Sequence, residues 1–378
     1  MTQRPENFCY APWTNIEIMQ NGQIVPCCKF VDSHYEQKFN ITTNSIADYQ
    51  NGRYLTDIKQ EFLNGEWPLG CERCKAEESH TKSKRNLDYI RWQSHYDNYD
   101  LNSGKYLTLG AAFGTTCNLK CIICNPYASS SWQKEYNDLY GIKVPIIRDF
   151  RKSIVKSITK IAPELIHIDI YGGEPFLSEI EEHKKLLNYY VQTGQAQHIT
   201  IHYTTNGTIF PDNSWFDIWD HFKEVDLQLS IDGVGDRFEY LRFPANWAEV
   251  EDNVKQYINR QKSNFRLSVA HTVSAFNIYY LDEMFYWCKN IGLPMPWINQ
   301  LHIPVYLSPF VWPEEARSMI AQHLFTSKWP QVKNWSNTMS KLGSTINLFQ
   351  EFIQFVNRHD QYRKLNFKKT FPELSNYI

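Results

Sequence analysis

The stretch "CNLKCIIC", residues 117–124, places three cysteines within eight residues, shortly after the β-rich run "YLTLGAAF" at residues 106–113. A tetrahedral zinc site needs a fourth ligand, and a disulfide framework needs an even number of cysteines. Three thiolates on one tight loop instead fit a cubane iron–sulfur cluster in which one iron stays open. A zinc loop, or cysteines buried for packing alone, is the alternative interpretation.

The β-rich run at residues 106–113 opens a series of similar runs that alternate with helical patterns. The other five runs are "LIHIDIY" (165–171), "HITIHYTT" (198–205), "VDLQLSI" (225–231), "RLSVAHTV" (266–273) and "WINQLHIP" (297–304). Strands joined by such short helical crossovers imply a parallel sheet with right-handed connections. Six units are fewer than the eight of a closed barrel. The sequence therefore predicts an α/β fold built on a partial (β/α)6, TIM-like barrel.

The segments before and after these runs do not follow the alternation. The first begins with a hairpin pattern, "IEIMQNGQIV" (16–25), in which Asn21 and Gly22 favour a type I′ turn. The last shows helical patterns alone. We therefore expect three parts: an amino-terminal hairpin and helix domain at residues 1–100, the partial barrel at residues 101–310 and a helical extension at residues 311–378.

Composition and charge limit the class of protein. Hydrophobic residues make up 42% of the chain and charged residues 21%, which predicts a folded protein with a sizeable core. A formal charge of −2 gives no overall attraction to nucleic acid or acidic lipid. The start "MTQRPENFCY" (1–10) lacks an apolar leader, and no apolar run reaches the roughly 18 residues of a membrane span. With nine cysteines, the chain is expected in a reducing compartment, the cytoplasm, without a membrane partner.

The spacing C-x3-C-x2-C of Cys117, Cys121 and Cys124 resembles the signature of the radical S-adenosylmethionine (radical SAM) superfamily. In that family, the amino and carboxylate groups of SAM chelate the open iron. Many members carry an aromatic residue before the third cysteine, whereas this chain has Ile123, which can still shield the cluster. The resemblance implies that the three cysteines hold the catalytic [4Fe–4S] cluster.

A second motif, "YGGEPFL" at residues 171–177, is similar to the GGEP motif of the same family. Gly172 and Gly173 allow the backbone to approach a ligand closely. Glu174 would accept charge-assisted hydrogen bonds from the cationic amino group of SAM. The motif follows the second predicted strand, so it is expected at the rim where barrel active sites assemble.

Two shorter motifs follow the third and fourth predicted strands. "TTNG" contains Asn206, and "SIDG" contains Ser230 and Asp232. They resemble the ribose- and carboxylate-binding positions of the radical SAM family. Each short motif alone is more often a plain turn, but the cysteine loop and the three motifs all fall just past the carboxyl ends of different strands. Their order along the chain therefore favours a radical SAM core.

Four further cysteines precede residue 75, with the spacing C-x17-C and C-x2-C: Cys9, Cys27, Cys71 and Cys74. This set resembles the twitch domain, the one-cluster relative of the SPASM extension of radical SAM enzymes, although here it precedes the barrel instead of following it. The resemblance implies a second [4Fe–4S] cluster, and a zinc ribbon with similar spacing is the alternative. Cys28 lies next to Cys27 and could replace it as a ligand.

The resemblance also implies the chemistry. An electron enters the first cluster, SAM is cleaved to methionine and a 5′-deoxyadenosyl radical, and the radical abstracts hydrogen from a C–H bond. A cluster closed by four thiolates suits electron transfer, so the amino-terminal cluster would take the second electron if the product is oxidised. An electron donor such as flavodoxin or ferredoxin is the expected partner. Whether the reaction is oxidative or redox-neutral, such as an epimerisation, stays open.

Most twitch and SPASM relatives act on ribosomally made peptides or protein side chains, which makes a peptide or protein the expected substrate. A minority act on aminocyclitols or sugars, so a small molecule is the alternative. Basic runs at residues 82–85, 151–160 and 363–369 would suit an RNA-modifying enzyme, but solvated helix faces explain them as well. A non-catalytic iron–sulfur regulatory protein is disfavoured because every SAM-binding motif is present.

Asp226 and Gln228 occupy inward-facing positions on the same predicted strand as Ser230, and His202 and His271 lie on neighbouring predicted strands. Any of them could contact a substrate or exchange a proton with it. A hydrogen-bonded place in the core is the alternative for each. The identity of the proton donor or acceptor therefore stays open.

Overall fold

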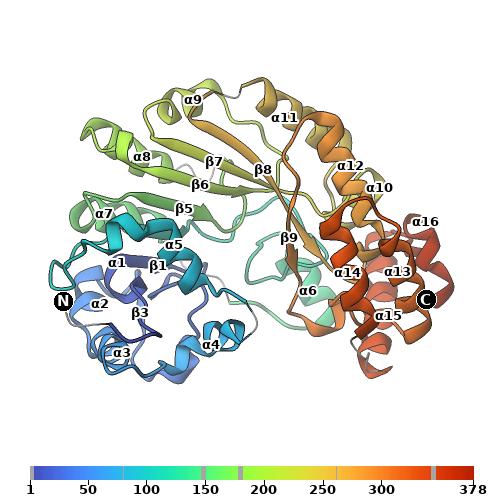
Figure 1. The fold of residues 1–378 in the computed structure, drawn as a ribbon. Coiled ribbons are helices and arrows are strands. Elements are labelled where there is room, and N and C mark those ends of the chain that lie inside the picture. Colours follow the sequence, from blue (N-terminus) through green and yellow to red (C-terminus); the bar gives the residue numbers. More distant parts are fainter. Residues whose placement is uncertain (1–3, 80, 146–149, 178–181, 261, 342–345) are drawn as a thin grey trace. The chain divides into compact units, whose positions relative to one another are not determined.

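The structure is a computed structural model of the chain (Figure 1). It describes residues 4–79, 81–145, 150–177, 182–260, 262–341 and 346–378. The chain forms two compact units. Unit 1 contains residues 1–116, 145–203 and 211–225, and unit 2 contains residues 117–144, 204–210 and 226–378. The expected three-part division at residues 100 and 310 stays a prediction.

Unit 1 is built on a mixed sheet with the strand order β3-β2-β1-β4-β5-β6. In chain order the strands are β1 (Asn15–Ile18), β2 (Gln23–Val25), β3 (Phe39–Asn40), β4 (Thr108–Ala112), β5 (His167–Tyr171) and β6 (Thr200–Thr205). β1 pairs antiparallel with β2 and parallel with β4, and β4, β5 and β6 are parallel. The predicted amino-terminal hairpin therefore extends the same sheet as the first barrel strands.

The turn between β1 and β2 differs from the predicted type I′ turn. Gly22 has a φ of +79°, but Asn21 is not among the residues with positive φ in the described chain. The N–H of Gly22 donates to the carbonyl of Met19 at 2.8 Å, and the side chain of Asn21 accepts from the N–H of Gln23 at 3.1 Å. The Asn21 side chain thus supports a turn that needs one left-handed residue, Gly22.

The helices of unit 1 are α1 (Ala11–Thr14), α2 (Ile46–Asn51), α3 (Arg53–Leu63), α4 (Glu72–Glu78), α5 (Lys84–Tyr96), α7 (Arg151–Ile161), α8 (Glu182–Gln192) and α9 (Asn213–Trp219). α2 begins after Ser45, which forms a reciprocal cap with Asp48. α3 is amphipathic and buries Leu55, Ile58 and Phe62 at helical spacing. α7 packs against α8, and α8 against α9 (Figure 1).

Unit 2 contains the last strands, β7 (Glu224–Ser230), β8 (Phe265–Val273) and β9 (Trp297–Gln300), in the order β7-β8-β9. β8 and β9 are parallel. Neither strand order closes on itself, so the sheet is open. Parallel strands that alternate with helices in an open sheet confirm the predicted α/β fold with a partial, TIM-like barrel.

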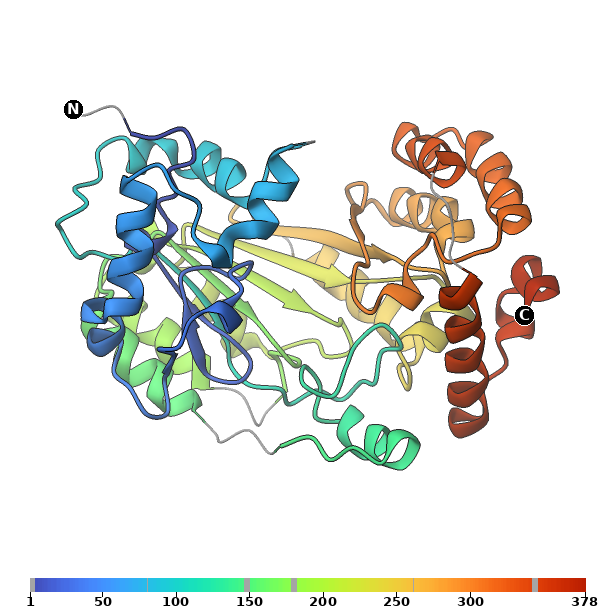
Figure 2. The same ribbon diagram turned by 90° about the horizontal axis from the view of Figure 1, so that it is seen from below.

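The helices of unit 2 are α6 (Trp132–Tyr140), α10 (Asp236–Leu241), α11 (Trp247–Asn259), α12 (Leu281–Ile291), α13 (Glu314–Phe325), α14 (Pro330–Lys341), α15 (Ile346–Arg363) and α16 (Phe367–Thr370). The carboxy-terminal helices (orange to red in Figure 2) share one core with β8 and the segment after it. Phe352 of α15 packs between Phe276 and Trp312, with ring centroids 5.1 and 5.3 Å apart. Across the described residues, no helix combines the length and the apolar character needed to cross a membrane.

Candidate active site and amino-terminal cysteine group

The cysteine loop of residues 117–124 follows β4 and precedes α6. Trp132, in the first turn of α6, donates its indole N–H to the carbonyl of Cys121 at 2.9 Å. Ser131 donates its hydroxyl to the carbonyl of Cys117 at 2.6 Å. The start of α6 therefore fixes the loop that carries the three thiols.

The three thiols lie within electrostatic reach of one another. Burial, together with the neighbouring thiols of Cys124 and Cys117, raises the pKa of Cys121 to about 12 against the opposing effect of Arg242. Burial likewise raises the pKa of Cys124 to about 11. Buried thiolates this close together repel one another unless a positively charged group binds them. The donor set therefore fits the irons of a cluster.

The "TTNG" loop joins the cysteine loop within unit 2. The Asn206 amide nitrogen donates to the side-chain oxygen of Asn118 at 2.9 Å and lies 3.9 Å from the sulfur of Cys117. Asn118 in turn donates to the hydroxyl of Thr208 at 2.8 Å, and Thr208 donates to the Asn206 oxygen at 2.7 Å. This closed ring of hydrogen bonds orients Asn206 beside the first predicted cluster ligand.

Asp232 of the "SIDG" motif holds a cation beside the same loop. Its buried carboxylate pairs with Arg242 at 2.6 Å and accepts a hydrogen bond from the N–H of Thr272 at 2.8 Å. A guanidinium nitrogen of Arg242 lies 3.8 Å from the sulfur of Cys121, and a cation at this distance favours the thiolate. No local motif marks Arg242, which is 121 residues from Cys121 along the chain.

The inward-facing strand residues differ in their surroundings. Ser230 ends β7 and is partly exposed, as are His202 and Asp226. His271 is buried, its Nδ1 bonds to the carbonyl of Ile231 at 3.0 Å, and burial lowers its pKa. His271 therefore occupies a hydrogen-bonded place in the core of unit 2.

The GGEP loop of unit 1 packs on the segment that leads into the cysteine loop. Gly172 and Gly173 have φ values of +85° and +60°, which favour glycine. A Cβ on Gly173 would lie 2.1 Å from the carbonyl oxygen of Thr116, the residue before Cys117. Glu174 is fully buried, and its N–H donates to the same carbonyl at 2.8 Å. The glycine pair thus brings Glu174 against the entry to the cysteine loop.

A buried ionic network in unit 2 fastens α6, and with it the cysteine loop, to α15. Glu135 of α6 accepts hydrogen bonds from His359 at 2.9 Å and Arg363 at 2.8 Å, and Lys120 lies 3.2 Å from its other oxygen. Burial alone would raise the pKa of Glu135, but these partners outweigh it and hold the pKa at about 2. A carboxylate with this pKa stays charged throughout the neutral range.

Glu135→Gln is expected to lower the free energy of unfolding by about 3 kcal/mol, because it leaves a buried guanidinium without its counter-charge. The pKa of Glu135 is lower in the folded chain than its ordinary value of 4.5. Its contribution is therefore complete above about pH 4.5 and lost only as the pH falls toward 2. Urea unfolding of wild type and variant should consequently differ by the same amount at pH 8 and pH 6. The exposed Glu164, which pairs with Lys105, gives the control variant Glu164→Gln.

The four amino-terminal cysteines come together within unit 1. Cys9 precedes α1, Cys27 follows β2, and Cys71 and Cys74 lie at the start of α4. Burial raises the pKa of Cys71, and the thiols of Cys9, Cys27 and Cys74 add to the rise. Burial also raises the pKa of Cys9 to about 12, with Cys74 contributing. Four thiols in mutual electrostatic reach match the donor set of a closed [4Fe–4S] cluster.

Cys28 faces a different group of residues. Burial raises its pKa, and of the neighbouring charges those of Glu17 and Lys84 affect it most. The thiols that raise the pKa of Cys71 are those of Cys9, Cys27 and Cys74. Cys27 is therefore grouped with Cys9, Cys71 and Cys74, and it also lines a small pocket of the same unit together with Cys28. Among the residues that the structure describes, no set of three or more Cys, His, Asp or Glu side chains is spaced to hold a single metal ion.

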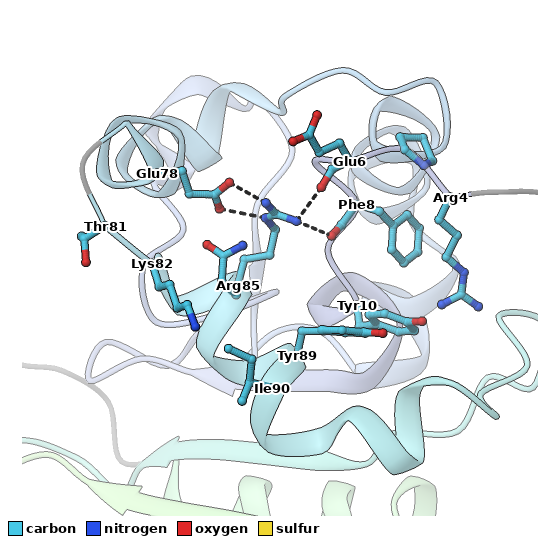
Figure 3. A pocket seen from close by; sticks show the side chains of 12 residues that line it. Arg4, Glu6, Phe8, Tyr10, Glu78, Thr81, Lys82, Arg85, Tyr89 and Ile90 are labelled. Atoms are coloured by element: carbon cyan, nitrogen blue, oxygen red, sulfur yellow. Dashed lines mark hydrogen bonds and ion pairs between the residues drawn. The ribbon is translucent and has the colours of Figure 1, made fainter.

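A pocket of about 540 Å³ lies over the chain segment that carries Cys9 (Figure 3). Arg85 of α5 spans it, donating to the carbonyls of Glu6 at 2.9 Å and Phe8 at 3.0 Å and pairing with Glu78 of α4. Tyr10, which follows Cys9, stacks on Tyr89 with ring centroids 6.0 Å apart. The guanidinium of Arg4 lies 4.5 Å from the ring centroid of Tyr10. Arg85 thus ties α4 and α5 to the segment that holds the first cysteine of the group.

Comparison with known proteins identifies this amino-terminal part. Residues 9–75 match the family model for SPASM, an iron–sulfur cluster-binding domain, and the matched segment contains Cys9, Cys27, Cys71 and Cys74. The predicted resemblance of the amino-terminal part to an auxiliary iron–sulfur cluster domain of the SPASM kind is therefore confirmed. No curated protein matches the sequence significantly.

Several solved structures are similar to the chain at low identity. A structure titled "Native anSMEcpe with bound AdoMet" is 20% identical, with a TM-score of 0.41 over 58% of this chain and 58% of that chain. A structure of the same protein with a bound Cp18Cys peptide is 19% identical, with a TM-score of 0.40 over the same shares. A structure of TYW1 with a lysine-pyruvate adduct is 13% identical, with a TM-score of 0.35 over 68% of this chain and 89% of that chain. The match thus spans less than two thirds of the first two structures.

Proposed function

We propose that this chain, which resembles radical SAM enzymes and carries a SPASM iron–sulfur domain at residues 9–75, cleaves SAM reductively and abstracts hydrogen from a substrate C–H bond. The observation that carries the proposal is the convergence of two motif loops on the cysteine loop. Asn206 lies 3.9 Å from the sulfur of Cys117, and Arg242, held by Asp232, lies 3.8 Å from the sulfur of Cys121. A zinc loop would need neither neighbour.

The proposed roles follow from these contacts. Cys117, Cys121 and Cys124 hold a [4Fe–4S] cluster, which with SAM supplies the radical chemistry. Arg242 stabilises the thiolate form of Cys121, and Asp232, which is also proposed to bind SAM, positions Arg242. Further residues are proposed to bind SAM, as their motifs imply: Gly172, Gly173, Glu174, Asn206 and Ser230.

The amino-terminal cysteines are proposed to hold a second [4Fe–4S] cluster that exchanges electrons. What supports this is the SPASM match together with the mutual electrostatic influence of Cys9, Cys27, Cys71 and Cys74. The expected partner is an electron carrier such as flavodoxin or ferredoxin. The pocket in Figure 3 reaches the segment next to Cys9 and offers such a carrier an aromatic surface near the cluster.

A peptide or protein side chain is the proposed substrate class. Unit 2 supports it with an open groove of about 690 Å³, lined by the inward-facing Gln228 and by Trp297 and Trp335. Trp297 is 62% exposed, which suits aromatic contact with an extended chain. An aminocyclitol or sugar is the alternative.

Three cations of the basic runs are held in ion pairs within the fold. In the run at residues 82–85, Lys84 pairs with Asp88 and Arg85 with Glu78. In the run at residues 363–369, Arg363 is buried and pairs with Glu135. These cations stabilise the fold and are not available to phosphate groups.

SAM binding tests the proposal directly. Glu174→Gln in anaerobically reconstituted protein is expected to raise the Kd for SAM by roughly 10-fold to 100-fold, because a charged hydrogen bond to the SAM amino group is lost. Equilibrium dialysis with labelled SAM measures the Kd. Glu164→Gln, an exposed carboxylate of the same unit, is the control and should leave the Kd unchanged. An unchanged Kd in Glu174→Gln would remove Glu174 from the SAM site.

A further inference from the structure

A small enclosed pocket in unit 1 contains charged groups that the proposed function does not use. Its volume is about 90 Å³, which admits a head group but not a whole amino acid. Its lining includes the carboxylates of Glu17, Asp88 and Asp169, the cations of Lys84 and Arg91, and the ring of His167, and the thiols of Cys27 and Cys28 also line it. The sequence gives no motif for the pocket, because its carboxylates, its cations and His167 come from two strands and one helix that are far apart in the chain.

Strand pairing puts two of the carboxylates on the same face of the sheet. Glu17 of β1 is the register partner of Gly110 of β4, and Gly110 is the register partner of Asp169 of β5. A Cβ on Gly110 would lie 2.3 Å from a carboxylate oxygen of Glu17. The Glu17 carboxylate therefore lies over Gly110, toward Asp169, in space that only glycine leaves open.

Glu17 is held in this position. It is 4% exposed, accepts a hydrogen bond from the hydroxyl of Tyr171, and lies 3.3 Å from the amide nitrogen of Asn15. Burial, with the negative charge of Asp169, raises the pKa of Glu17 to about 7 in spite of the Tyr171 hydrogen bond. Two carboxylates in a buried site repel each other, and a bound cation relieves that repulsion.

The two cations of the pocket each have a contact of their own. Lys84 pairs with Asp88 at 2.7 Å, and the Arg91 guanidinium lies 4.7 Å from the ring centre of Trp92. The pocket therefore has three acidic side chains against two basic ones. Its net charge favours a ligand that brings a positive charge.

His167 is the independent sign of a ligand. It lines the pocket, is 8% exposed, and its Nδ1 has no hydrogen-bond partner among the described residues. Burial holds its pKa well below the ordinary value, against the opposing effect of a hydrogen bond to the backbone of Thr200, so the ring is neutral. A neutral imidazole whose other nitrogen carries the proton leaves Nδ1 as an acceptor. A buried acceptor without a partner costs free energy unless a donor reaches it.

We propose that Glu17, Asp169 and His167 bind the ammonium or guanidinium head group of the substrate, offering acceptors to a cation rich in N–H donors. The substrate class named here rests on the proposed function, since the pocket would hold one end of the molecule whose C–H bond reacts. A lysine or arginine side chain of a peptide and an amine of an aminocyclitol share this chemistry.

Binding measured without turnover tests the proposal. Anaerobic calorimetry on reconstituted protein at pH 8 would compare Gly-Lys-Gly and Gly-Arg-Gly with the neutral Gly-norleucine-Gly, and would include 2-deoxystreptamine as the small-molecule arm. A cationic probe is expected to bind at least tenfold tighter than the neutral peptide. Glu17→Gln and Asp169→Asn should each remove most of that preference, whereas Glu164→Gln should retain it.

The outcomes separate this proposal from the proposed function. Preference for a cationic peptide supports the peptide class, and preference for 2-deoxystreptamine alone supports the cation site while overturning the peptide class. Equal binding of charged and neutral probes, or an unchanged preference in folded Glu17→Gln and Asp169→Asn, overturns the cation site. A melting curve shows whether Glu17→Gln and Asp169→Asn are folded. One folded variant of the two is enough for the test. The proposed cation site does not take part in SAM binding, so the Kd for SAM in Glu17→Gln should equal that of wild type. If wild type itself failed to bind SAM, that result would contradict the proposed function and would leave the cation site untouched.

Discussion

Replacing Cys117, Cys121 and Cys124 together by alanine is expected to abolish the formation of 5′-deoxyadenosine from SAM and to remove about four of about eight irons per chain. The reason is that, in the described part of unit 2, these are the thiols beside which Asn206 of the "TTNG" loop and Arg242, the partner of Asp232, lie. Without the cluster, no electron reaches SAM. Chromatography of anaerobic reactions with a chemical reductant measures the nucleoside, and colorimetric assay measures iron.

A matched control separates loss of chemistry from loss of fold. Cys288 of α12 is buried, and its sulfur lies 3.9 Å from the sulfur of Met284. Cys288→Ala removes a buried thiol from the same unit and should retain iron and 5′-deoxyadenosine formation. A triple variant that still makes the nucleoside at the wild-type rate would contradict the proposed function. If wild-type protein contained about four irons and one zinc per chain, the cluster of the 117–124 loop would still be supported. The amino-terminal cysteines would then be assigned to zinc.

The alternation of strands and the place of each motif could be predicted from the sequence, because both depend on residues that are close together in the chain. Period-two runs give strands, and glycine-rich turns after them give the loops that meet Thr116 and Cys117. The open sheet follows from the number of units. Gly173, for example, has a φ of +60° and leaves no room for a Cβ beside the carbonyl of Thr116. The double glycine of the motif already indicates such a position.

The contacts that complete the sites could not be predicted, because they depend on strand register and on long-range packing. Arg242 reaches Cys121 only once α10 has folded back, and no pattern marks it. Glu17 and Asp169 face each other across Gly110 because three strands pair in one register, and a shift by one residue would turn them to opposite faces. The turn at Gly22 differs from prediction because the Asn21 side chain forms its own hydrogen bond to the backbone.

The amino-terminal cysteine group gives the second large expected effect. Cys71→Ala combined with Cys74→Ala should remove about four irons, retain 5′-deoxyadenosine formation in the presence of substrate, and block an oxidised product. Hydrogen abstraction needs only the cluster of the 117–124 loop, whereas the electron left on the substrate radical needs an acceptor. Mass spectrometry of the substrate after reaction measures the product.

A structural role of the cluster predicts a different result, and the contacts of unit 1 show how to tell the two apart. The segment that carries Cys9 is already fastened to α4 and α5 by Arg85, through the carbonyls of Glu6 and Phe8 and the carboxylate of Glu78. Because this attachment does not involve sulfur, the double variant is expected to keep its circular dichroism spectrum and a cooperative melting transition. Cys28→Ala is the matched control, since Cys28 faces Glu17 and Lys84 and should be dispensable for iron. A folded double variant that forms normal amounts of oxidised product would rule out electron transfer through this cluster, and an unfolded one would show that the metal, as in other small metal-stapled domains, is what holds the segment together.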